Sequence, residues 1–545
     1  MYNIVGDILN QELFVNKNLI KMSKVNSSKY DLIKNSIVIG VMTLISRITG
    51  LIRDMCLAHF VGSSRTADLF LIALRVPNTF RAIFADGAFN NTFIPLLSKI
   101  RETDDKTQLK QFIKDILSIL FYVLLIFTLI TLIFMPVIVT IFAGSIQNKE
   151  VFNNLIMICR ITFPFLLFIS IARFFSGLLE IQNKFCLSAF SPIITNIFSI
   201  LGIMFAGYYS LNIAIWGAVA FSTGGLIQAY ILFHANIKNG FGIVPHPIFT
   251  FYRNINNIFH KKNTKIFTKN IIPGILSGGI YNINIMISTF FASGITGAIS
   301  WIYYAERFVQ LPLGIVGIAI GTVLLPKLSA ANSDTEIENY FNKACKYVLF
   351  LMIPIVIGLI IIGNLLIDLI YKSGTFNITD VNNVNKALII LSTSLPFLAL
   401  NRYISIVFYA KHDTKTPMKI AFYSAIFNTI CSYILVNTFG FLGVTFASTL
   451  ITIINFLMLY FVMHKRQRIK IHISTVKFCI GILIASAIMA IAVFYLKLNI
   501  NESWNDFSTF KKIVQICKIS GIGAITYMIV FVLLFAENKF SKLKI

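Results

Sequence analysis

Long hydrophobic runs separated by short polar breaks make up most of this chain of 545 residues. Most runs extend over about twenty residues, enough for a helix to cross a hydrocarbon core of roughly 30 Å. The pattern predicts an all-α polytopic membrane protein with about fourteen transmembrane helices. These spans are expected near residues 35–60, 67–98, 115–144, 153–180, 186–208, 211–235, 268–294, 299–326, 345–370, 383–410, 416–437, 440–463, 476–497 and 513–536.

The composition agrees with this pattern and argues against a soluble domain. Hydrophobic residues form 57% of the chain, charged residues only 13%, and the mean hydropathy is +0.79. A soluble domain of this length needs a larger polar fraction to cover its surface.

The net charge of +25 raises the question of nucleic-acid binding, which the placement of the basic residues answers. Basic residues gather in alternate breaks: before residue 34, at 99–114, in the acid-free stretch 238–269, and at 411–419, 464–472 and 539–544. The opposite breaks are short and nearly free of Lys and Arg. This asymmetry predicts cytoplasmic N and C termini and contact with membrane lipids, with no nucleic-acid partner.

Four sequence fragments recur in order at a nearly constant spacing. KNSIVIGV resembles KNIIPGIL, TFIPLLS resembles VLLPKLS, AFSPIITN resembles AFYSAIFN, and WGAVAFST resembles LGVTFAST. The members of each pair lie 235, 231, 232 and 226 residues apart. A duplication of this length predicts two pseudo-symmetric six-helix lobes in the same orientation, with a substrate site between them.

The duplication divides the chain into five parts. We expect a cytoplasmic N-terminal segment at 1–33, an N-lobe with helices 1–6 at 34–236, a basic cytoplasmic linker at 237–267, a C-lobe with helices 7–12 at 268–466, and helices 13–14 with a cytoplasmic tail at 467–545. Residues 1–21 contain no span, so Met22 is an alternative start of translation.

The charged residues singled out as site candidates lie in three of the predicted spans. They are Arg47, Arg53 and Asp54 in the first span, Asp68, Arg75, Arg81 and Asp86 in the second, and Glu306 and Arg307 in the eighth. An ionised Arg that faces hydrocarbon costs at least about 2.5–3.5 kcal/mol, so these side chains are expected to face the interior. Because arginines outnumber acids and each guanidinium pairs with two oxygens, the cluster favours a phosphate or pyrophosphate ligand.

Interhelical salt bridges are the alternative interpretation of the acidic residues. Arg47 and Asp54 lie seven residues apart and therefore share nearly one helix face, so a pair between them is open. The chain contains no nucleotide-binding loop, metal-ligand motif or nucleophile elbow. We therefore expect no enzyme activity and no cofactor, with transport driven by the membrane potential or an ion gradient.

Two long stretches carry a family resemblance. SRITGLIRDMCLAHFVGSSRTADLFLIALRVPNTFRAIFADGAFNNTFIPLLS at 46–98 resembles the signature of the MurJ (MviN) lipid II flippases, and SWIYYAERFVQLPLGIVGIAIGTVLLPKLS at 300–329 resembles the matching element of their second lobe. The resemblance implies the multidrug/oligosaccharidyl-lipid/polysaccharide exporter fold, with two lobes around a central cationic cavity and a lipid-facing groove at the last two helices.

The resemblance also implies a substrate and a location. The substrate is lipid II, undecaprenyl-pyrophosphate carrying a disaccharide-pentapeptide, moved by alternating access from the inner to the outer leaflet of the bacterial cytoplasmic (inner) membrane for cell-wall biogenesis. Other cell-wall synthesis proteins are further partners that it leaves open.

The family's essential arginines match Arg47, Arg53, Arg81 and Arg307, and an acidic residue matches Asp68. Arg75 and Asp86 lie where the family tends to be basic and acidic. Members with a sodium site use an acidic residue in the seventh helix, whereas this chain offers the amides Asn282, Asn284 and Asn428, which are weak candidates. The resemblance therefore leaves sodium coupling open.

Three alternatives to this function remain. An exporter of another lipid-linked oligosaccharide shares the anionic anchor. A drug/cation antiporter of the same superfamily requires carboxylates in its cavity where this chain has surplus arginines. A non-transporting scaffold is favoured only if the arginines are dispensable.

Overall fold

The computed structural model describes residues 38–82, 93–101, 106–329, 333–411, 413–467, 469–501 and 503–540, with the side chains of 106, 270–281, 315–329, 410, 467, 501 and 536–540 left out. Every regular element within these ranges is a helix, as the sequence predicted. Asp86, one of the candidate site residues, lies outside the described residues.

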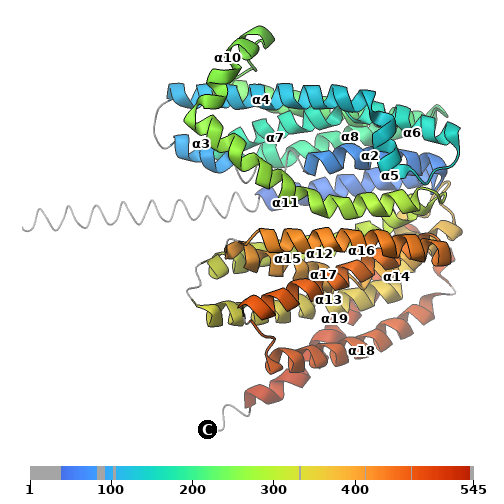
Figure 1. Ribbon diagram of the computed structural model, residues 1–545. Helices are drawn as coiled ribbons and strands as arrows, with labels where there is room; N and C mark the ends of the chain where they lie inside the picture. Colours follow the sequence, from blue (N-terminus) through green and yellow to red (C-terminus); the bar gives the residue numbers. More distant parts are fainter. Residues whose placement is uncertain are drawn as a thin grey trace, which may run out of the picture.

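The helices form two bundles and a terminal pair, which Figure 1 shows stacked one above another. The N-terminal bundle consists of the first helix (residues 38–61), α2 (Arg65–Arg81), α3 (Ile94–Arg101), α4 (Lys106–Ile133), α5 (Met135–Ala143), α6 (Lys149–Thr162), α7 (Phe165–Ile181), α8 (Phe185–Tyr208) and α9 (Ile213–Lys238).

The C-terminal bundle and the terminal pair follow a short connecting helix, α10 (Ile248–His260). The bundle consists of α11 (Lys262–Ala292), α12 (Ala298–Ser329), α13 (Asp334–Tyr371), α14 (Ile378–Ser392), α15 (Leu395–Ala410), α16 (Lys415–Phe439) and α17 (Phe441–Gln467). The terminal pair is α18 (Ile473–Asn501) and α19 (Thr509–Phe540), joined through the short 3₁₀ turn η3 (Trp504–Asp506). It packs against α13.

Polar side chains begin several of these helices by accepting hydrogen bonds from the first free backbone N–H groups. Ser64 caps α2, Asn148 caps α6 and Asn212 caps α9. Asn377 and Asp380 form a reciprocal capping box at the start of α14. The polar breaks of the sequence thus determine where the helices start.

Small residues bring helices of the N-terminal bundle close together. A Cβ atom on Gly202 of α8 would lie 2.2 Å from the Cβ of Ala220 on α9. One on Gly224 of α9 would lie 3.1 Å from the Cα of Thr195 on α8. Such close backbone contact is typical of helix pairs in membranes, where dispersion between packed helices replaces the hydrophobic effect.

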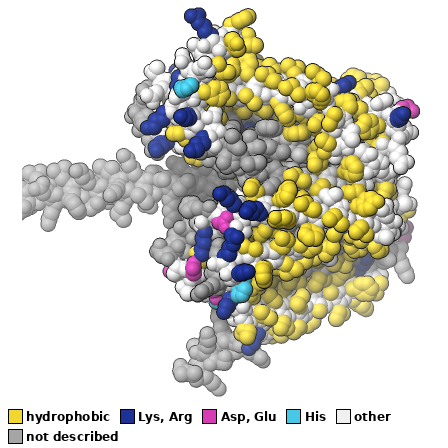
Figure 2. All heavy atoms as spheres, in the orientation of Figure 1, with side chains coloured by type: hydrophobic (Ala, Val, Ile, Leu, Met, Phe, Trp, Pro, Cys, Tyr) yellow, Lys and Arg dark blue, Asp and Glu magenta, His cyan; other side chains and the backbone are white. Residues whose placement is uncertain are grey.

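This is a multi-pass membrane protein, although the predicted count of fourteen spans is not confirmed. Within the described ranges nine helices are long and apolar enough to cross a membrane, and the bent pair α14 and α15 makes a tenth. The first helix, α2, α11 and α12 occupy the other predicted spans and are helical wherever they are described. In Figure 2 hydrophobic side chains cover much of the visible face of both bundles.

The two ends of the bundles differ in their loops. We call the end with loops 182–184, 239–247, 413–414 and 469–472 the basic face, because Lys and Arg gather there in Figure 2. We call the end with loops 62–64, 144–148, 293–297 and 372–377 the closed face, because the two bundles are hydrogen-bonded to each other there.

Candidate substrate site between the two bundles

The first helix and α12 lie antiparallel along the seam between the bundles. Asp54 on the first helix contacts Arg307 on α12, and Arg47 contacts Gly314. Asp54 lies seven residues after Arg47, and Gly314 lies seven residues after Arg307. Seven residues make about two helical turns, a rise of about 10 Å in total, so the two contacts are in register. We call this helix pair the seam.

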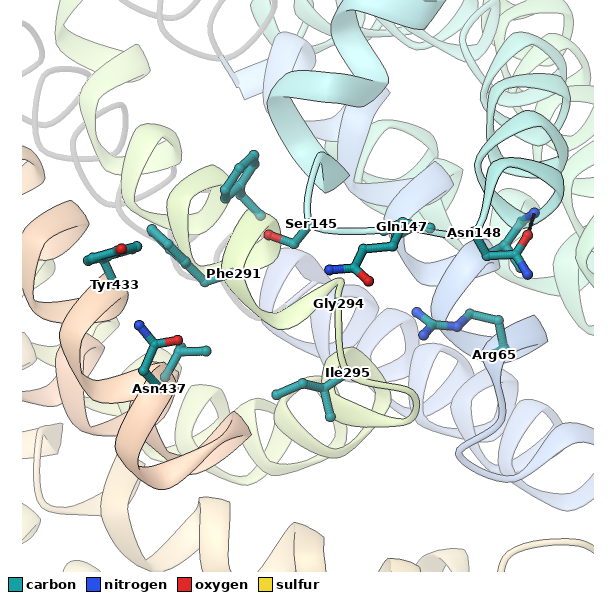
Figure 3. A pocket seen from close by; sticks show the side chains of 13 residues that line it. Arg65, Ser145, Gln147, Asn148, Phe291, Gly294, Ile295, Tyr433 and Asn437 are labelled. Carbon is teal, nitrogen blue, oxygen red and sulfur yellow. Dashed lines mark hydrogen bonds between the residues drawn. The ribbon is translucent and has the colours of Figure 1, made fainter.

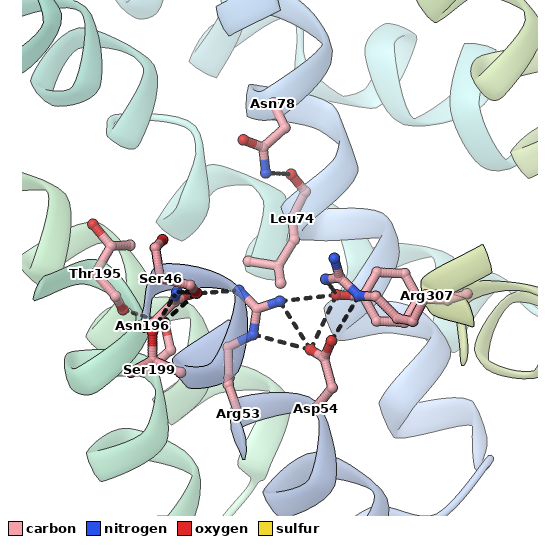
Figure 4. A network of polar contacts seen from close by, with 11 residues as sticks. Ser46, Arg53, Asp54, Leu74, Asn78, Thr195, Asn196, Ser199 and Arg307 are labelled. Atoms are coloured by element: carbon pink, nitrogen blue, oxygen red, sulfur yellow. Dashed lines mark hydrogen bonds and ion pairs between the residues drawn. The ribbon is translucent and has the colours of Figure 1, made fainter. Parts of the chain in front are cut away.

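Asp54 is the centre of a charged cluster on the seam, drawn in Figure 4. Its side chain is only 1% exposed. Its Oδ1 accepts hydrogen bonds from Arg53 Nη2 at 2.8 Å, Arg53 Nε at 3.1 Å and the Tyr303 hydroxyl at 3.1 Å. Its Oδ2 forms an ion pair with Arg307 Nε at 2.7 Å. One carboxylate therefore holds two guanidinium groups, one from each bundle.

Tyr303 and Asn196 extend this cluster on both sides. Tyr303, one turn before Arg307, accepts a hydrogen bond from Arg53 Nη2 at 2.8 Å and another from Arg307 Nη2, and the Arg307 guanidinium lies 4.5 Å from the centre of its ring. Asn196 on α8 accepts from Arg53 Nη1 at 3.3 Å. Its amide donates to the Ser46 carbonyl, which ties the first helix to α8.

Arg47 is in a different position, two turns closer to the basic face. Its guanidinium is exposed and lies against the backbone of α12 at Gly314, where an added Cβ would be 2.6 Å from both Nη atoms. Within the part of the chain that the structure describes, Arg47 makes no hydrogen bond or ion pair. The ion pair between Arg47 and Asp54 that the spacing left open is not formed, because Arg53 and Arg307 occupy both oxygens of Asp54.

Arg75 and Arg81 lie on α2. Arg75 donates to the Thr289 hydroxyl on α11 at 2.8 Å and pairs with Glu306 on α12 at 3.3 Å, so it also joins the two bundles. Arg81 Nε donates to Asn78 at 3.2 Å within α2. Among the predicted site residues, Arg47, Arg53, Asp54, Arg75, Glu306 and Arg307 are thus brought to the interface between the bundles.

Asp68 is placed at the closed face, away from the charged cluster. It is fully buried at the start of α12 and accepts from Gly297 N–H at 2.6 Å, Ser300 N–H at 2.9 Å and the Ser300 hydroxyl at 2.7 Å. The carboxylate caps the exposed N–H groups of a helix in the other bundle and complements its dipole. Its contacts are those of a residue that holds the bundles together.

Further contacts seal the same end. Arg65 donates to the Ser293 carbonyl and the Thr296 hydroxyl, both at 2.7 Å. The Thr375 amide donates to the His59 carbonyl at 2.9 Å, and Gly374, with φ of +57°, lets the loop reach that backbone.

A cavity of about 560 Å³ lies between the bundles on this side and is shown in Figure 3. Arg65, Gln147 and Asn148 line it from the N-terminal bundle, and Phe291, Tyr433 and Asn437 line it from the C-terminal bundle. The charged cluster around Asp54 does not line this cavity. The cavity is therefore separate from the predicted anion site.

The predicted cation candidates on α11 and α16 are partly brought together. The Asn428 amide donates to Asn284 Oδ1 at 3.0 Å, and the Ser432 hydroxyl donates to Asn428 Oδ1 at 3.2 Å. The amide oxygens therefore serve as acceptors within the protein. Among the described residues no group of three or more His, Cys, Asp or Glu is placed to hold a metal ion.

Sequence reasoning missed Tyr303, Asn196 and Gly314. Tyr303 and Arg307 are four residues apart, so the helical period placed them on one face. Asn196 ends AFSPIITN, one of the repeated fragments, yet its partner Arg53 lies 143 residues away. No local signal indicates that Gly314 faces Arg47.

Two helical bundles joined along a guanidinium-bearing seam define the fold class of this multi-pass membrane protein. The fold is similar to that of a multidrug resistance transporter of the MATE family in an inward-facing conformation. That similarity has a TM-score of 0.62 at 14% identity and covers 79% of this chain and 98% of that chain.

The chain belongs to the MurJ lipid II flippase family. The family's sequence profile, "Lipid II flippase MurJ", matches residues 57–515. A solved structure described as "Lipid II flippase MurJ, inward closed conformation" has a TM-score of 0.74 at 25% identity over 92% of this chain and 99% of that chain.

Relatives in two bacteria extend this comparison. The "Probable lipid II flippase MurJ" of Rickettsia prowazekii is 31% identical over 86% of this chain and 90% of its own length. That of Buchnera aphidicola from Baizongia pistaciae is 32% identical over 90% and 96%. These matches confirm the resemblance seen in the two signature stretches.

Proposed function

We propose that this protein translocates lipid II, a pyrophosphate-linked peptidoglycan precursor, from the inner to the outer leaflet of the bacterial cytoplasmic membrane. The observation that carries the proposal is Arg47 on the seam, which has no ion-pair partner among the described residues and lies next to a cluster in which two arginines share one carboxylate. Three guanidinium groups against one carboxylate leave two positive charges for an anionic headgroup, and each guanidinium matches two phosphate oxygens.

The charge distribution supports an orientation and a starting state. The basic face is cytoplasmic, as are both termini, by the positive-inside rule. The closed face is then the outer one, sealed by Asp68, Arg65 and Thr375. The substrate enters the seam from the cytoplasmic side, and release requires these closed-face contacts to break.

If this orientation is right, a cysteine that replaces Thr375 is labelled by an impermeant reagent in intact cells. Labelling only after lysis contradicts this orientation.

The chain acts as a transporter and performs no bond chemistry. We propose that the membrane potential acts on the charged arginines of the seam and that no sodium ion or cofactor is needed. The contacts between Asn284, Asn428 and Ser432 support this, because their side-chain groups bond to one another. In proteoliposomes, an imposed potential without sodium is expected to drive transport; a requirement for a sodium gradient contradicts the coupling but not the substrate.

Reconstituted transport tests the function directly. Purified protein in liposomes is given lipid II in one leaflet, and its appearance in the other is followed with an enzyme that acts only on the exposed headgroup. The parent protein is expected to move lipid II, and Arg47→Ala is expected to bind and move it at least tenfold less. Equal movement of an undecaprenyl-pyrophosphate with an unrelated glycan favours the broader exporter function, and unaltered transport by Arg47→Ala contradicts the anion site.

A further inference from the structure

The connecting helix α10 carries an apolar face that the protein covers only in part. At about 100° per residue, Phe251 and Ile258 lie within about 20° of each other, and both are buried. Ile248, Tyr252 and Phe259 form a second group within about 40°, roughly a quarter turn further round the helix. All three of these are exposed, Tyr252 by 79%.

The exposed apolar group is held in a fixed direction, because both ends of α10 are attached to one carboxylate. Asp115 on α4 is fully buried. It pairs with His246 at 3.1 Å, two residues before α10 begins, and with Lys261 at 2.6 Å, directly after α10 ends. Phe251 also stacks on Tyr122 of α4, with ring centres 4.8 Å apart. The exposure of Tyr252 therefore follows from tertiary contacts.

The position of α10 places this face at the membrane boundary. Only Lys261 separates α10 from α11, the first long helix of the C-terminal bundle. Figure 1 shows α10 slanted across the direction of the long helices and projecting past the upper edge of the N-terminal bundle, nearer the end that carries the basic face. A helix with an exposed apolar face at this level fits the interface between headgroups and acyl chains.

The charge around α10 indicates which lipids fit. The chain contains no Asp or Glu between Glu180 and Glu306. Arg253, on the polar side of α10, and Lys262 and Lys265, in the first turn of α11, are all exposed. The nearby acid Asp115 is already paired with Lys261 and His246. The surface therefore matches an anionic partner.

We propose that α10 docks onto anionic phospholipids of the leaflet at the basic face. Ile248, Tyr252 and Phe259 insert at the headgroup boundary, while Arg253, Lys262 and Lys265 contact lipid phosphates. The docked helix anchors the start of α11 to the bilayer next to the N-terminal bundle. This binding concerns bulk phospholipid, so it stands or fails independently of the transported substrate.

Depth-dependent fluorescence quenching tests the insertion with the full chain in nanodiscs. Tyr252→Trp places an indole on the apolar side, and Asn257→Trp is the matched control on the polar side of the same helix. The emission of Trp216, Trp301 and Trp504 is measured in the parent protein and subtracted. Lipids brominated in the upper acyl chain are expected to quench most of the emission added by Tyr252→Trp and none of that added by Asn257→Trp. An unquenched Tyr252→Trp, or equal quenching of both, overturns the proposal.

The lipid preference is tested in the Tyr252→Trp protein in an equimolar mixture of phosphatidylglycerol and phosphatidylcholine. Bromine carried by phosphatidylglycerol is expected to quench about twofold more than bromine carried by phosphatidylcholine, because basic side chains enrich anionic lipid nearby. Adding Arg253→Gln, Lys262→Gln and Lys265→Gln is expected to abolish this difference while insertion persists. Equal quenching by the two lipids before these changes, or a difference that survives them, overturns the selection of anionic lipid.

Discussion

Two positions along the seam use the same kind of residue in opposite ways. Near its middle, Arg53 and Arg307 are bound to Asp54, and Tyr303 bonds all three side chains. Two turns closer to the basic face, Arg47 extends over Gly314 without a hydrogen-bonding partner among the described residues. One helix pair therefore carries both a charge cluster that joins the bundles and a guanidinium that is free to meet a ligand.

This difference separates stability from binding. A buried ion pair contributes little net stability, but removing one of its partners leaves an uncompensated charge and is strongly destabilising. An exposed guanidinium without partners contributes little to folding, so its removal affects ligand binding most. Substitutions of these residues are therefore expected to differ most in their effect on stability.

Asp54→Ala is expected to destabilise the protein by about 3–5 kcal/mol, because Arg53 and Arg307 lose their shared counter-charge. Thermal unfolding in detergent measures the loss. Adding Arg307→Ala is expected to recover part of it, since it removes one stranded charge. A single Asp54→Ala variant that melts like the parent shows that the cluster does not hold the bundles together.

In Asp68→Ala, three donors of Gly297 and Ser300 lose their acceptor, and each stranded donor costs at most about 1–3 kcal/mol. The free energy of unfolding is therefore expected to fall by about 2–4 kcal/mol. The substitution also weakens the closed face. A cysteine at position 375 is therefore expected to react faster with a soluble thiol reagent in the Asp68→Ala background than in the parent. Unchanged reactivity together with an unchanged melting temperature contradicts the role of Asp68 at this face.

Arg47→Ala is expected to change stability by no more than about 0.5 kcal/mol, as is usual for exposed side chains. Binding of the pyrophosphate lipid is expected to fall by about tenfold to a hundredfold, since one charge-assisted contact is worth about 1.5–3 kcal/mol. Arg47→Lys restores binding only in part, because an ammonium lacks the planar fork. If Arg47→Ala instead lowers the melting temperature as strongly as Asp54→Ala, the contrast between these two positions on the seam is wrong.

Gly314→Ala is expected to have the smallest effect. The added Cβ lies 2.6 Å from the Arg47 guanidinium, which is the flexible end of a long side chain and moves aside. Stability is expected to stay within about 0.5 kcal/mol of the parent, while lipid II transport falls moderately. In an Arg47→Ala background the same change is expected to have no further effect on transport, which a double-mutant cycle measures. An equal loss in both backgrounds shows that Gly314 acts independently of Arg47.

The fold was largely predictable, because a hydrocarbon core permits few structures. Long apolar runs become helices since no water is present to bond an open backbone, and a repeat of this length predicts two bundles. The site was predictable in composition only. Arg53, Asp54, Arg75, Glu306 and Arg307 do gather between the bundles, but the pair suggested for Arg47 and Asp54 is replaced by contacts with Arg53 and Arg307.

The sequence by itself determined the helical class, the membrane setting, the basic loops and the set of charges between the bundles. These depend on residue type and on period, which are local properties. Only the tertiary structure decided that Asp68 caps a helix of the other bundle, that Asp54 holds two arginines, and that Arg47 and Tyr252 are left exposed. The physical reason is that pairing energies depend on distances of a few ångströms between residues that are, in most of these contacts, more than 200 positions apart.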